Sequence, residues 1–115
     1  MNPPFSPTRK VDGWVFLAGQ GGFDENGKLA GETIETQTEQ TLRNVERLLA
    51  EHGCTLGDVV SCLVHLSDLG NLGNLEGYND VYARHFAEPR PVRTTVGAPL
   101  LGDMLVEITA VARQP

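Results

Sequence analysis

Two charged residues near the carboxyl end, Arg93 and Glu107, have the types and surroundings that best suit chemistry. Each lies among apolar neighbours in a β-rich run, and a turn containing Gly and Pro separates the two runs. The arginine guanidinium is always charged and offers a planar fork of donors that fits a carboxylate. A half-buried glutamate can hold and polarise a water molecule. Together they would suit a small carboxylate-bearing substrate attacked by water, with no covalent nucleophile.

The spacing of the two runs, which lie within 91–112, suggests how the residues meet. If the runs pair as a hairpin with its turn near Leu101, Thr95 lies opposite Glu107 and Arg93 lies opposite Thr109. Because strand side chains alternate between faces, all four would lie on one side of the sheet. A solvent-facing salt bridge between the strands explains the same residues, and such a bridge contributes little. On the hairpin alone, both interpretations stay open.

Other signatures of chemistry are missing from the sequence. It contains neither a GxSxG nucleophile elbow nor a GxxxxGK[ST] phosphate loop. The glycine-rich turn at 19–22 is not followed at once by a helix, so we interpret it as the end of a strand. His52, His65 and His85 lack metal-ligand spacing, so we assign them structural roles and expect no metal and no cofactor.

Hydrophobic periodicity predicts the elements that must position Arg93 and Glu107. In chain order they are strands at 6–11 and 14–20, a helix at 34–52, a strand at 59–66, a helix at 74–86 and the two terminal runs. Asp12-Gly13 is a two-residue turn signal, and Thr33 is the expected helix N-cap. Both helices can pack on one face of a single sheet. The predicted class is therefore a two-layer α+β fold with the order β-β-α-β-α-β-β.

A two-layer domain leaves the other face of its sheet uncovered. We expect Leu63, Leu105 and Val111 on that face, with Val60 on the covered side beside Cys62. An apolar face with polar groups set into it is typical of an association surface. We therefore predict a closed homo-oligomer that buries this face, with a pocket lined by Arg93 at a subunit boundary.

Length and composition narrow the class of protein. The 115 residues suit one domain, 1–115, and the content of 40% hydrophobic and 21% charged residues is typical of a globular chain. The formal charge of −6 and the scattered basic residues disfavour nucleic acid as a partner. No run approaches the roughly 20 apolar residues of a membrane span, and the amino terminus has no signal-peptide core. We expect a cytoplasmic protein, no membrane partner, and reduced Cys54 and Cys62.

Six fragments spread along nearly the whole chain carry a resemblance to a known family. They are Ala18-Gly19-Gln20, Gln37-Thr38 with Leu42-x-Asn44-Val45, Gly57-Asp58-Val59-Val60, Asn79-x-x-Tyr82-x-x-x-Phe86, Pro91-x-Arg93-Thr94 and Val106-Glu107-Ile108-x-Ala110-Val111-Ala112. In order and spacing they resemble the reactive-intermediate deaminase family, also called Rid or YjgF-like. The resemblance implies a chorismate-mutase-like fold and a homotrimer with three clefts between subunits. It also implies hydrolysis of enamines and imines, such as 2-aminoacrylate and 2-iminopropionate, to 2-keto acids and ammonia.

The resemblance also implies roles for individual residues. Arg93 matches the arginine that grips the substrate carboxylate, and Glu107 matches the glutamate assigned to the attacking water. Gly19 matches a glycine that lines the cleft, and Asn79 matches a helix residue near it.

The chain departs from the family pattern at three places. Phe5 stands where a tyrosine is usual, so the ring is kept and the hydroxyl is lost. Thr95 stands where a cysteine is common, which keeps backbone contacts and removes the thiol. Gly21-Gly22 replace Ile-Pro, and we expect them to loosen the cleft mouth.

The departures leave other functions open beside imine hydrolysis. A pathway-specific deaminase would act on a larger enamine, such as an aminomuconate-type compound. A non-catalytic protein that binds small carboxylates would not need the missing hydroxyl. Ribonuclease activity is also associated with the family, and the charge of −6 disfavours it for this chain.

Overall fold

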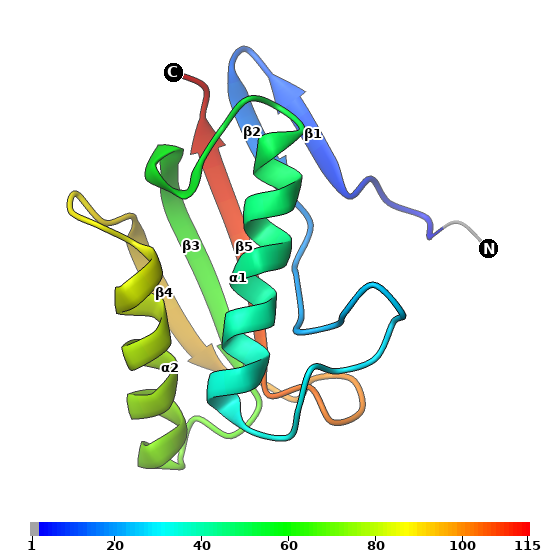
Figure 1. Ribbon diagram of the computed structural model, residues 1–115, viewed down its shortest axis with the longest axis vertical. Helices are drawn as coiled ribbons and strands as arrows, with labels where there is room; N and C mark the ends of the chain where they lie inside the picture. The colour runs from blue at the N-terminus through cyan, green and yellow to red at the C-terminus, as the bar shows by residue number, and fades with distance from the viewer. Residues whose placement is uncertain (1–2) are drawn as a thin grey trace.

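A five-stranded sheet carries two α-helices on one face in this computed structural model, which describes residues 3–115 (Figure 1). The elements are β1 (Thr8–Val11), β2 (Trp14–Leu17), α1 (Ile34–Ala50), the short 3-10 helix η1 (Leu56–Asp58), β3 (Val59–Leu66), α2 (Leu72–His85), β4 (Val92–Gly97) and β5 (Val106–Arg113). Apart from η1, this is the predicted order. The two helices lie on the same side of the sheet, which confirms the two-layer α+β class.

The predicted bounds are close to those observed. β3 begins and ends as predicted. β1, β2 and α1 are each shorter at one end than the predicted 6–11, 14–20 and 34–52, and α2 begins and ends slightly before the predicted 74–86. β2 stops early because the chain leaves the ladder after Leu17, and Gln20 then makes an isolated bridge to Ile108 of β5.

Local signals explain α1 and the β1–β2 hairpin. Thr33 caps α1, with its Oγ1 accepting a hydrogen bond from the Thr36 amide at 3.2 Å. The helix then turns its apolar stripe into the core, with buried residues Ile34, Thr38, Leu42, Val45, Leu48 and Leu49. Asp12 and Gly13 adopt φ values of 51° and 82°, as a tight turn between paired strands requires.

The sheet order, β1-β2-β5-β3-β4, shows that the predicted carboxyl-terminal hairpin was wrong. β5 lies between β2 and β3 and runs antiparallel to both, whereas β4 is an edge strand parallel to β3. A parallel pair needs a long crossover, and α2 supplies it. The segment 98–105 then carries the chain past β3. It is longer than the roughly two to five residues of a typical hairpin loop.

The parallel register of β4 turns two of the predicted site residues toward the helices. Arg93 lies beside Cys62, and Thr95 lies beside Val64. Cys62 and Val64 are both buried in the core under the helices. Neighbours in register share a face of the sheet. The side chains of Arg93 and Thr95 therefore also project from the helix-covered face.

The register of β5 places the other two residues on the opposite face. Glu107 lies beside His65, and Thr109 lies beside Leu63. These positions alternate with the fully buried residues of β5, so they point away from the helices. The expectation that Arg93 shares a face with Glu107 was therefore wrong, because it assumed a hairpin that the topology does not contain.

The face of the sheet opposite the helices is rich in exposed apolar side chains. The strand residues exposed there are Val11, Trp14, Phe16, Leu63, Val92 and Val96. Leu63 and Val111 lie on this face as predicted, whereas Leu105 packs against the core instead. Val60 was expected on the covered face with Cys62, but its side chain is exposed. A bulge between Val59 and Ser61 shifts the alternation of side chains between the two faces of the sheet.

Candidate functional site

Gly19 and Glu107 lie together on the uncovered face. Hydrogen bonds join the amide of each of Gln20 and Ile108 to the carbonyl of the other, at 2.8 and 2.9 Å, and hold the chain after Gly19 against β5. A Cβ atom at position 19 would lie 2.8 Å from Cδ of Glu107. The glycine therefore provides the space that the Glu107 side chain occupies.

Two buried amides of α1 hold the segments that flank this pair. Asn44 Nδ2 donates to the carbonyl oxygens of Gly21 and Phe23 at 3.0 and 2.8 Å, which fixes the loop after Gly19. Gln37 Oε1 accepts a hydrogen bond from the Leu105 amide at 2.8 Å, just before β5. In the sequence, both residues stand out only as parts of the family fragments. Their polar side chains near the buried stripe were a signal for this positioning role.

His65, for which the sequence predicts only a structural role, is a further neighbour of Glu107. Its Nδ1 lies 3.8 Å from Glu107 Oε1, and both side chains are half-buried. Nothing in the sequence alone pairs residues on two strands so far apart in the chain. Only the register between β3 and β5 brings them together.

Arg93 lies against the aromatic side of α2. Its guanidinium carbon is 5.2 Å from the ring centroid of Tyr78 and 4.9 Å from that of Tyr82, a cation–π arrangement. The residue is exposed, and no carboxylate within residues 3–115 forms an ion pair with it. The donor fork is therefore available to a carboxylate from outside the chain.

Three side chains on the helix-covered side, those of Tyr78, Tyr82 and Thr95, carry hydroxyl groups. All three hydroxyl groups are buried, and none has a hydrogen-bond partner among the described residues. Burial raises the pKa of Tyr78 and of Tyr82, an effect that the charge of Arg93 partly opposes. Both tyrosines therefore remain protonated at neutral pH. Burial also raises the pKa of the Cys62 thiol, so this cysteine is not a thiolate nucleophile.

A single copy keeps the Arg93 and Glu107 groups apart. In register, Glu107 is level with His65, whereas Arg93 is level with Cys62, three residues along β3 and two strands from β5. Strand geometry then separates the two Cα atoms by about 14 Å, with the side chains on opposite faces. A site that uses both residues must take them from two copies.

The remaining predicted residues lie near different parts of the sheet. Asn79 is half-buried on α2, one residue after Tyr78. Phe5 is 62% exposed on the segment that precedes β1. Within residues 3–115 of one copy, neither residue takes part in the cation–π contacts of Arg93 or in the close contacts of Glu107 with His65 and Gly19.

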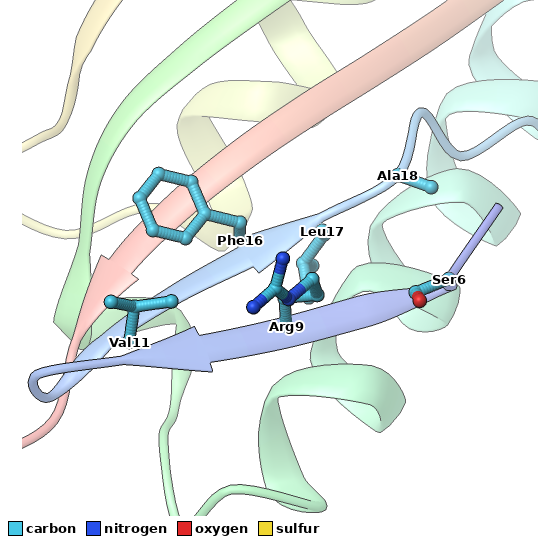
Figure 2. A pocket seen from close by; sticks show the side chains of 6 residues that line it. All are labelled: Ser6, Arg9, Val11, Phe16, Leu17 and Ala18. Atoms are coloured by element: carbon cyan, nitrogen blue, oxygen red, sulfur yellow. The ribbon is translucent and has the colours of Figure 1, made fainter.

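A shallow hollow of about 380 Å³ lies at the β1–β2 hairpin (Figure 2). Arg9, Val11 and Phe16 line it from the uncovered face, and neither Arg93 nor Glu107 takes part. The hollow is thus not lined by either of the two charged residues of the predicted site. In the described part of the chain, no three His, Cys, Asp or Glu side chains gather as metal ligands. No helix there has the length and apolar character to cross a membrane.

Comparison with known proteins identifies the family. The family model for Endoribonuclease L-PSP, which covers YjgF and Rid proteins, matches residues 2–114. The chain belongs to this family. A RutC family protein of Pyrococcus abyssi is 36% identical over 111 residues, which are 95% of this chain and 85% of that protein. Reactive Intermediate Deaminase A, a chloroplastic protein of Arabidopsis thaliana, is 37% identical over 93 residues, 80% of this chain and 48% of that protein.

Solved structures of the Rid family share the fold. RidA from an Antarctic Psychrobacter has a TM-score of 0.87 and 32% identity, covering 96% of this chain and 89% of its own. Yeast Mmf1 has a TM-score of 0.89 and 28% identity, covering 100% of this chain and 90% of its own. These likenesses confirm both the resemblance and the chorismate-mutase-like fold that it implied.

Proposed function

We propose that this protein hydrolyses small enamines and imines that carry a carboxylate, of the 2-aminoacrylate and 2-iminopropionate type, to 2-keto acids and ammonia. The observation that carries the proposal is the free guanidinium of Arg93, exposed beside two tyrosine rings with no acidic partner in residues 3–115. Membership of the Rid family and likeness to a reactive intermediate deaminase support this type of activity.

In the proposed reaction, Arg93 binds the substrate carboxylate through two parallel hydrogen bonds and orients the C=N carbon. Glu107 accepts a proton from water as the water oxygen bonds to that carbon, and the C=N electron pair moves to nitrogen. Protonated Glu107 returns this proton to the nitrogen, which gives the neutral carbinolamine. The hydroxyl proton of the carbinolamine then moves through Glu107 to the amine nitrogen, the C–N bond breaks with its electron pair leaving on ammonia, and the oxygen forms the C=O bond of the 2-keto acid. An enamine enters the same sequence after tautomerising to the imine.

We further propose that the site is completed between copies in a homotrimer. Arg93 is on the edge strand β4, where another copy can reach it, while Glu107 is on the uncovered face. That face exposes Leu63, Phe16 and other apolar side chains, as subunit interfaces do before assembly. Contact between the β4 edge of one copy and the uncovered face of the next would bring the two charged groups to one cleft.

An imine-hydrolysis assay tests the proposed function. An amino-acid oxidase acting on alanine generates 2-iminopropionate in place, and semicarbazide traps the imine that has not been hydrolysed. We expect the protein to lower the trapped fraction and to speed pyruvate release. No acceleration with a panel of small and large imines would overturn the proposal. Saturable 2-keto-acid binding by calorimetry without turnover would instead identify a non-catalytic binder.

Gly19→Ala should lower kcat because the new methyl group would meet the Glu107 carboxyl group at 2.8 Å and displace it. A shift of this size in a reacting group costs about 10- to 100-fold in rate. Gly70→Ala is the matched control, since a Cβ atom there has open space and Gly70 does not require a positive φ. Equal kcat values for the two variants would remove Glu107 from the water-activating role.

A further inference from the structure

We propose that His65 is a positioning residue that holds the Glu107 carboxylate for its work on water, an inference that rests on the proposed function. The two residues are direct neighbours in the antiparallel register of β3 and β5, on the uncovered face. His65 Nδ1 lies 3.8 Å from Glu107 Oε1. This nitrogen is buried, and within residues 3–115 it has no hydrogen-bond partner. An unpaired buried nitrogen so close to a carboxylate calls for a specific reason.

The surroundings of His65 leave Glu107 as its charged partner. Its neighbour in register on β4 is Val96, and the preceding residue of β3 on the same face is Leu63. Both of these side chains are apolar. On the other flank of Glu107, Gly19 contributes no side chain. Among residues 3–115, no basic side chain other than His65 lies within 4 Å of this carboxylate. The Glu107 carboxylate therefore lies between the backbone of Gly19 and the imidazole of His65.

The geometry suits orientation of the carboxylate more than direct proton transfer to substrate. At 3.8 Å the groups are within ion-pair range, and a small approach would give an N–H to oxygen hydrogen bond. The side chains are 26% and 34% exposed, so water screens the pair less than it screens a surface pair. With Oε1 held by the imidazole, Oε2 stays free to accept the proton of the attacking water.

A positioning role predicts a specific kinetic pattern. Arg93 holds the substrate carboxylate, so loss of His65 should leave KM within about twofold of wild type. Loss of orientation at Glu107 should lower kcat by about tenfold. His65→Phe keeps an aromatic ring and removes the donor. His65→Asn places an amide nitrogen where Nδ1 stands, so it should restore most of kcat.

The chain offers a matched control in a second histidine–glutamate pair. His85 Nε2 lies 3.2 Å from Glu39 Oε2 on the helix side of the molecule, away from Glu107. His85→Asn breaks this pair and should leave kcat and KM at wild-type values. A loss of kcat in this variant as large as in His65→Phe would overturn the inference, because any disturbed histidine would then have the same effect.

A spectroscopic readout tests the pair without relying on turnover. In protein carrying isotope-labelled histidine, the nitrogen resonance of His65 Nδ1 should move when Glu107→Gln removes the carboxylate charge. An unmoved resonance, or a His65→Phe variant with wild-type kcat, would overturn the inference while leaving the proposed function standing. Wild-type protein without turnover would overturn the proposed function, and the His65 resonance would then decide alone whether the two side chains are paired.

Discussion

Arg93→Ala is expected to lower kcat/KM for 2-iminopropionate by about 100-fold or more, mainly through KM. The substrate carboxylate would lose two charge-assisted hydrogen bonds. Truncating one partner of such a hydrogen-bonded charge pair costs about 2–5 kcal/mol, and each 1.4 kcal/mol or so is a factor of ten. Arg90, whose charge also acts on Tyr82, already has an acidic neighbour, since its Nη1 lies 3.6 Å from Glu88 Oε1. The measurement is steady-state imine hydrolysis with the oxidase-coupled assay.

Two further variants sharpen the Arg93 experiment. Arg93→Lys keeps the charge and removes the planar fork, so it should recover only part of kcat/KM. Arg84→Ala removes another exposed arginine, from the last turn of α2, and should leave the kinetics unchanged. Because Arg93 is exposed, its variants should fold, which a thermal melt checks. A wild-type KM in the Arg93→Ala protein would contradict the proposal that Arg93 binds the substrate carboxylate.

Mixing two inactive variants should restore activity. Glu107→Gln keeps the shape of the side chain and loses the proton acceptor, so it should lower kcat by about 100-fold or more. In a closed ring assembled at random from Arg93→Ala and Glu107→Gln copies, roughly one interface in four joins an intact Arg93 to an intact Glu107. We therefore expect up to about a quarter of wild-type activity from the mixed oligomers.

The mixing experiment has a direct control in the state of assembly. Native mass spectrometry of each variant alone should give the oligomer of the wild type, and the mixture should contain both kinds of copy in one particle. Mixed particles that stay inactive would contradict a cleft shared between copies. Recovery in the mixture cannot come from either variant alone, because each lacks one of the two charged groups.

The size of the recovery separates two arrangements of the site. A site within one copy would show no recovery on mixing, since every copy carries one of the two substitutions. The separation of about 14 Å, across opposite faces of one sheet, makes this arrangement unable to serve a single small substrate. Because of this strand order and register, the proposed reaction requires an oligomer in which two copies contribute Arg93 and Glu107.

The uncovered face also explains why the amino-terminal hairpin exposes so many apolar groups. Trp14 and Phe16 of β2 are 38% and 46% exposed and lie on the same face as Leu63 of β3. Phe16 also lines the hollow in Figure 2, and neither Arg93 nor Glu107 is among its lining residues. In the proposed trimer, we expect this hollow to be covered by another copy and not to be the substrate cleft.

The sequence by itself determined the secondary elements and their order. The helical spacing of α1, its Thr33 cap, the Asp12-Gly13 turn and the bounds of β3 all agree with the structure. These features depend on residues close together in the chain, where the alternation of apolar and polar side chains carries the signal. Arg93 and Glu107 could also be singled out early, because charged residues in apolar strands are uncommon.

The tertiary structure alone decided which strands are neighbours and which faces the charged side chains take. A β-rich run has no local mark of its partner, so the last two runs were paired as a hairpin, although the α2 crossover sets β4 parallel to β3. That one difference in pairing moves Arg93 to the tyrosines of α2 and leaves Glu107 beside His65. Side-chain direction in a strand follows from register, and register is set by contacts between segments far apart in the chain.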